Sequence, residues 1–106
     1  MKALGLSSHE IELLNSVFRR HPEITEVRLF GSRAKGSHRI NSDIDLAVWG
    51  NVSPLRAQAI VAELDELPLP YRYDLEPYDS IQFPPLREHI QRVGIRLYPD
   101  VQGEAL

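Results

Sequence analysis

Apolar residues recur at helical spacing in several parts of the chain. Over residues 7–20 they fall three or four positions apart, with Ser at the start and paired Arg at the end, as suits the two ends of a helix. A second helix is predicted over 53–67, because Ser caps a helix and the Pro that follows is tolerated at its first position. Residues 86–94 predict a last short helix ended by glycine, and 32–36 are compatible with a single helical turn.

A period of two predicts the strands. Apolar and polar residues alternate over 24–30, 43–50 and 71–78, which is typical of strands with one buried face. Residues 95–99 indicate a further extended piece, a short edge strand. Residues 79–85 are expected to form a loop, because paired prolines disfavour regular structure.

This order of elements predicts a small sheet covered by helices on one side. The link between the first two strands is only about a dozen residues, near the lower limit for a parallel crossover, so the two strands are expected to pair antiparallel. That pairing would bring Gly31 and Ser32, at the end of one strand, beside Asp43 at the start of the next.

Composition adds limits. With 106 residues, 42% hydrophobic and 25% charged, residues 1–100 are expected to form one globular domain and 101–106 a tail. The sequence has no apolar run of membrane-spanning length and no signal-peptide core near its N-terminus, so we expect a cytoplasmic protein. The absence of cysteine and the scattered histidines leave oxygen atoms as the ligands for any metal. A net charge of −3 disfavours direct nucleic-acid binding as the main task.

Two carboxylates on one strand face carry the first sign of chemistry. Asp43 and Asp45 are two positions apart and so share a face, opposite Ile44 and its apolar neighbours. Carboxylates held this close repel one another unless a cation such as Mg²⁺ lies between them. A site with two ions needs another carboxylate, and Asp74, on the polar face of the strand over 71–78, is the best candidate.

The loop before these carboxylates can bind phosphate. Gly31 allows close approach of the backbone and Ser32 adds a hydroxyl donor, while Arg33, Lys35 and Arg39 can meet the remaining phosphate charge. Each feature alone is more simply an ordinary turn, a solvated strand face or surface charge. Their joint order favours a site for Mg²⁺ and a nucleoside triphosphate.

These residues carry a resemblance. Gly31-Ser32, then ten residues, then Asp43-Ile44-Asp45 is similar to the signature of the DNA polymerase beta-like nucleotidyltransferases. The stretches LFGSRAKG and SDIDLAV resemble the minimal nucleotidyltransferase (MNT) proteins within that superfamily, and the likeness extends over about residues 8–98.

The resemblance implies an α+β fold with a small mixed sheet covered by helices. It also implies Mg²⁺, with two ions, as cofactor and ATP or another NTP as donor. In that family the D-x-D pair and a third acidic residue are catalytic and bind the metals, which corresponds here to Asp43, Asp45 and Asp74. The family's Gly-Ser pair contacts the triphosphate, which corresponds to Gly31 and Ser32.

The basic residues Arg33 and Lys35 are carried over as further nucleotide-binding residues. The third acidic position is open, because Glu76 and Asp79 lie close to Asp74 in the sequence and each could take its place.

MNT proteins are commonly antitoxins of HEPN-domain toxins, and some relatives transfer AMP to the toxin. The resemblance therefore predicts transfer of AMP to a hydroxyl of a HEPN-domain partner. Two alternatives stay open: an inactive antitoxin that acts by binding alone, and an enzyme for a small-molecule or RNA acceptor.

Overall fold

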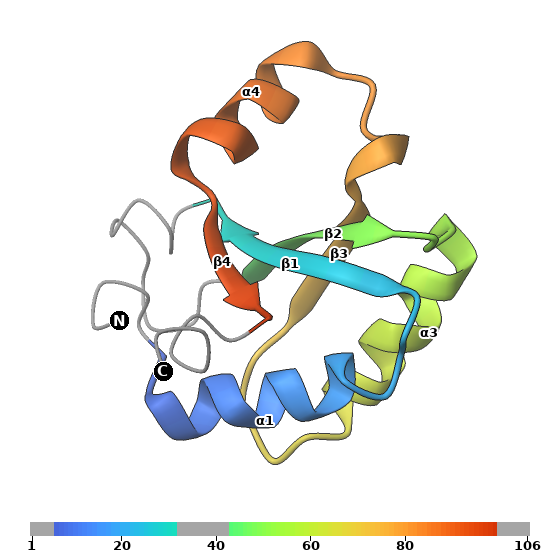
Figure 1. Cartoon of the computed structure of the whole chain (residues 1–106). Coiled ribbons are helices and arrows are strands. Elements are labelled where there is room, and N and C mark those ends of the chain that lie inside the picture. Colours follow the sequence, from blue (N-terminus) through green and yellow to red (C-terminus); the bar gives the residue numbers. More distant parts are fainter. Residues whose placement is uncertain (1–5, 32–42, 100–106) are drawn as a thin grey trace.

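A computed structural model describes residues 6–31 and 43–99 (Figure 1). Along these ranges the elements are α1 (Ser8–Phe18), β1 (Ile24–Phe30), β2 (Ile44–Gly50), α3 (Pro54–Asp65), β3 (Tyr73–Pro77), the short 3₁₀ helix η2 (Tyr78–Ser80), α4 (Pro84–Val93) and β4 (Ile95–Tyr98). The expected turn over 32–36 and the tail over 101–106 lie outside the described residues.

The four strands form one mixed sheet in the order β3-β2-β1-β4. β1 pairs antiparallel with β2, as the short link between them predicts. β2 and β3 are parallel, with α3 in the crossover, and β4 pairs antiparallel with β1 at the other edge. The α+β class and the mixed sheet are therefore confirmed, as is the edge position of the last strand.

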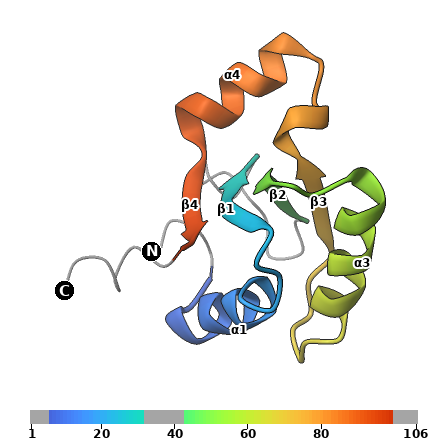
Figure 2. The same ribbon diagram turned by 45° about the vertical axis from the view of Figure 1, so that its right-hand side comes forward.

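One face of the sheet carries the main core. The apolar positions of the alternating pattern in β2 are completely buried there, including Ile44 and Leu46. Helices α1 and α3 cover this face with Leu14, Phe18 and Ile60, none of which is exposed (Figures 1 and 2). Burying side chains of this size stabilises the fold by roughly 1.5–3 kcal/mol each.

The opposite face carries a smaller cluster under α4, so the expectation of helices on one side only is wrong. Phe30, Ala47 and Ile90 are buried there together with two residues that follow β3, Tyr78 and Ile81. In both ribbon views α4 lies across the sheet from α1 (Figures 1 and 2). Only Ile90 of α4 is fully buried. The sequence pattern of this helix therefore does not indicate which face of the sheet the helix covers.

The expected loop over 79–85 is also partly wrong. η2 occupies its first residues, and α4 begins at Pro84 rather than at residue 86. The first turn of a helix has no intrahelical partners for its N–H groups, so proline is accepted there at no cost. Paired prolines mark the start of this helix instead of excluding it.

Hydrogen bonds fix the N-terminus of α1. Ser7 accepts from the Glu10 N–H, and one carboxylate oxygen of Glu10 accepts from the Ser7 N–H, which is a capping box. The other oxygen of Glu10 accepts a hydrogen bond of 2.9 Å from the hydroxyl of Tyr71, which lies just before β3.

Across residues 6–31 and 43–99 no helix has the length and apolar content needed to cross a membrane.

Candidate functional site

The sheet register brings one residue from each of three strands into a row. Asp45 at the start of β2 is the partner of Phe30 at the end of β1 and of Asp74 in β3. Partners in neighbouring strands have their Cβ atoms roughly 4.5–5.5 Å apart. Because Ile44 and Leu46 point into the main core, Asp45 points to the opposite face, the one that α4 partly covers.

The other acidic candidates lie around this row. Asp43 is exposed immediately before β2, two positions from Asp45. Glu76 is the partner of Ala47 and is half-buried, one step along the same face from Asp74. Asp79 lies beyond the strand, exposed in η2. Of the two alternatives to Asp74, Glu76 thus lies on the same face of β3 as Asp74, whereas Asp79 lies after the end of the strand.

Gly31 closes over the carboxylate of Asp45. Its φ is +79°, in the left-handed region, and a Cβ built on it would clash with Oδ2 of Asp45. A side chain at this position would therefore be strained and would displace the carboxylate. Gly31 thus makes a close contact within the protein itself, to Asp45, while its predicted contact with a triphosphate stays a prediction.

The carboxylates disfavour one another's ionised form. Burial raises the pKa of Asp45 above its ordinary value of 3.8, and the negative charges of Asp74, Asp43 and Glu76 add to this. Burial, and then Asp74, likewise raises the pKa of Glu76. The cluster thus concentrates negative charge at one end of β2, where a cation would relieve the repulsion.

The donor set fits a hard divalent cation, since each group is a carboxylate oxygen that Mg²⁺ accepts as ligand. Within the described ranges, no three acidic or histidine side chains lie close enough together to hold an ion as they stand. Ser32, Arg33, Lys35 and Arg39 lie outside the described residues. Their predicted contacts with phosphate stay predictions.

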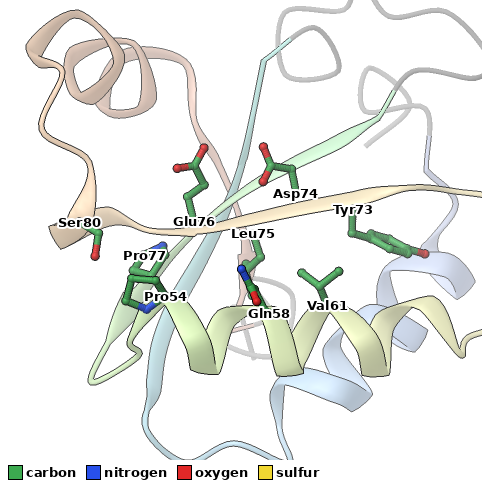
Figure 3. Close-up of a pocket in the computed structure, with 9 residues that line it drawn as sticks. All are labelled: Pro54, Gln58, Val61, Tyr73, Asp74, Leu75, Glu76, Pro77 and Ser80. Carbon is green, nitrogen blue, oxygen red and sulfur yellow. The ribbon is translucent and has the colours of Figure 1, made fainter.

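A pocket of about 410 Å³ lies beside Asp74 and Glu76 (Figure 3). One wall is the face of α3 that carries Pro54, Gln58 and Val61, and the other wall is β3. Their spacing of four and three places these residues on one helix face, but nothing in the sequence distinguishes that face from an ordinary exposed one.

A column of stacked side chains, which no pattern in the sequence predicts, joins η2 and α4 to the sheet. Arg28 lies 5.0 Å from the centre of the Trp49 ring, Trp49 stacks on Tyr78 at 4.6 Å, and Arg87 lies 4.2 Å from the centre of the Tyr78 ring. Arg87 also donates to the carbonyls of Tyr78 and Ile81, both at 2.9 Å. This column holds η2, whose Ser80 lines the pocket, against β2 and α4.

Residues 12–102 match the protein family described as polymerase beta, nucleotidyltransferase. The chain belongs to this family. A solved structure described as a candidate minimal nucleotidyltransferase is 32% identical, with a TM-score of 0.65 over 82% of this chain and 88% of that chain. No curated protein matches the sequence.

Solved structures of toxin–antitoxin complexes share the fold. A chain of a complex described as a toxin–antitoxin with AMP-PNP is 23% identical, with a TM-score of 0.71 over 90% of this chain and 77% of that one. A chain of a second complex, described as a tri-AMPylated Shewanella oneidensis HEPN toxin with an MNT antitoxin, is 22% identical, with a TM-score of 0.58 over 90% and 74%. At this identity the likeness establishes the polymerase beta-like nucleotidyltransferase fold.

Proposed function

We propose that this chain is a Mg²⁺-dependent nucleotidyltransferase that moves AMP from ATP to a hydroxyl group of a HEPN-domain toxin, and that it is the toxin's antitoxin. The observation that carries the proposal is the row of Asp45 and Asp74, with Gly31 against Asp45, in a chain of the nucleotidyltransferase family. The AMP-PNP complex supports the choice of nucleotide, and the AMPylated HEPN toxin supports the choice of acceptor.

Each residue has a defined part in this proposal. Asp43, Asp45 and Asp74 would hold Mg²⁺, which when bound neutralises charge that develops on the phosphate oxygens. Gly31, Ser32, Arg33 and Lys35 bind the triphosphate.

The acceptor oxygen forms a bond to the α-phosphorus while the bond from that phosphorus to its bridging oxygen breaks, and pyrophosphate leaves. Asp74, exposed at the rim of the site, accepts the proton of the hydroxyl.

The test uses the chain together with the product of the adjacent gene, which the proposal expects to be a HEPN-domain protein. With Mg²⁺ and ATP labelled at the α-phosphate, wild type is expected to label the partner, and Asp45→Asn is expected to label it at least about 100-fold more slowly. Glu12→Gln is the matched control, because it removes one exposed carboxylate in α1, on the other side of the sheet from the row, and should leave labelling intact.

The other functions predict different results. If wild type and Asp43→Asn/Asp45→Asn neutralise the toxin equally and neither labels it, the chain acts by binding alone and the transfer proposal is wrong. Labelling of RNA ends or of a small hydroxyl compound, with none on the protein, contradicts the choice of acceptor only.

A further inference from the structure

Over residues 6–31 and 43–99, β3 is an edge strand with one unpaired side. It stands at the end of the sheet order, and among the described residues only β2 pairs with it. The Ile44 N–H donates to the Arg72 carbonyl at 2.9 Å, so the backbone groups of Arg72 point toward β2. Backbone groups of a strand alternate in direction, so the N–H and C=O groups of Tyr73 and Leu75 face outward.

The pocket lies along this unpaired edge. β3 passes in front of the viewer in Figure 3, with Gln58 and Val61 of α3 on one side of it and the carboxylates of Asp74 and Glu76 on the other. The five residues of β3 span roughly 16 Å at 3.3 Å per residue. The edge is therefore long enough for a partner segment of about five residues.

We propose that this edge is the docking site for the acceptor: an extended, basic segment of the partner protein pairs with β3 as an added strand and presents its hydroxyl beside Asp74. The inference deepens the proposed function and rests on it, because the docked segment is an acceptor only if the chain transfers AMP. Side chains of an added strand alternate between its faces. Every second one would meet Gln58 and Val61, and the others would meet Asp74 and Glu76.

Geometry places the hydroxyl within reach. An added strand runs about 4.8 Å from β3, and side chains of facing residues have Cβ atoms about 4.5–5.5 Å apart. A Ser, Thr or Tyr facing Asp74 can thus bring its oxygen to hydrogen-bonding distance of that carboxylate, where the proton must go when the bond to phosphorus forms.

Charge selects the occupant. Asp74, Glu76 and Asp79 line or follow the edge, and Asp65 acts electrostatically on Tyr73 from the end of α3. Lys or Arg on either side of the hydroxyl residue would be attracted to these groups. A second copy of this chain paired edge to edge would instead face its own carboxylates, which is unfavourable.

The test measures docking without nucleotide, so that it can fail or succeed independently of AMP transfer. The probe is the acetylated and amidated pentapeptide Lys-Val-Thr-Val-Lys, whose Lys and Thr side chains share a face; Glu-Val-Thr-Val-Glu is the control peptide. In the free ¹⁵N-labelled protein the amide protons of Tyr73 and Leu75 are expected to exchange readily with water, whereas that of Ile44 is protected. The basic peptide slows exchange at Tyr73 and Leu75, and the acidic peptide does not.

Two variants on α3 provide a matched pair. Gln58→Arg puts a cation into the groove and should weaken binding of the basic peptide about tenfold, whereas Ala59→Arg, about 100° further around the helix and exposed, should not. Equal effects of the two variants, equal binding of the two peptides, or protection at β4 instead of β3 would overturn the inference. So would protection that depends on protein concentration without peptide, because that indicates pairing of two copies. If AMP is transferred to the partner but the peptide does not slow amide exchange at Tyr73 and Leu75, the proposed function stands and only the docking site is wrong.

Discussion

At the scale of single residues, the candidate site is a compromise between folding and chemistry. Asp45 lies against the backbone of Gly31, and its burial together with the neighbouring carboxylates raises its pKa. The strand period identifies Asp45 as a residue of the polar face. It cannot reveal which atom closes over the carboxylate, because that depends on the conformation at Gly31 and on the pairing of β1 with β2.

Replacing Asp45 by Asn is expected to stabilise the metal-free protein at pH 7. A carboxyl whose pKa is raised in the folded state adds most stability below its ordinary pKa of 3.8, where it is protonated, and this contribution is lost as pH rises through the folded-state pKa. The gain should stay below about 1 kcal/mol, because solvent screens a half-exposed charge.

Urea unfolding in EDTA at pH 7 and pH 3 measures this difference. The gain should vanish at pH 3 and shrink on adding Mg²⁺, which stabilises only the wild type. Asp79→Asn, the control, should change the free energy of unfolding by less than about 0.5 kcal/mol. A gain of equal size at both pH values would contradict the charge explanation.

Gly31→Ala tests the closure over Asp45. The left-handed φ should cost about 1–2 kcal/mol in any background, and the clash with Oδ2 adds to this only while Asp45 is present. In a double-mutant cycle with Asp45→Ala, Gly31→Ala should therefore be less costly by at least about 0.5 kcal/mol. Additive free energies of unfolding would show that the carboxylate moves away freely.

At the scale of elements, the sequence indicates which segments form strands better than how the last helix packs. β1 has the predicted bounds, and β2 and β3 are shorter than predicted by one to three residues, because alternation with a buried face is a local signal. The position of α4 depends on contacts that have no period. Arg87 bonds to two carbonyls of the segment before the helix, and no pattern in the sequence marks an arginine for such a role.

Arg87→Ala should destabilise the protein by about 1–3 kcal/mol, because two carbonyls lose their donor and the ring of Tyr78 loses its cation. Arg92→Ala on the same helix is the control, with an exposed ion pair to Glu88 and an expected cost below about 1 kcal/mol. Chemical denaturation followed by the fluorescence of Trp49, the single tryptophan, compares the two. Equal losses would show that the bonds of Arg87 add nothing beyond a surface charge.

At the scale of the whole molecule, the motif predicts part of the candidate site, and the pairing of the strands is needed for the rest. The spacing from Gly31 to Asp43 and Asp45 predicts both the family and the edge of the sheet at which the site lies. The sequence cannot identify the third carboxylate in the same way, because Asp74, Glu76 and Asp79 are all acidic and lie close together in the chain. The parallel register of β3 places Asp74 opposite Asp45, while the role of each stays a prediction.

The unequal cores on the two faces of the sheet have a consequence for local unfolding. α1 packs Leu14, Val17 and Phe18 into the main core, whereas α4 buries only Ile90 completely. Opening of α4 should therefore cost less free energy than global unfolding, and its amide protons should exchange before those of α1 in native-state hydrogen exchange. Equal protection of the two helices would contradict this. The side of the sheet that carries the carboxylates is then the side that opens first, so a partner could gain access to it without unfolding the protein.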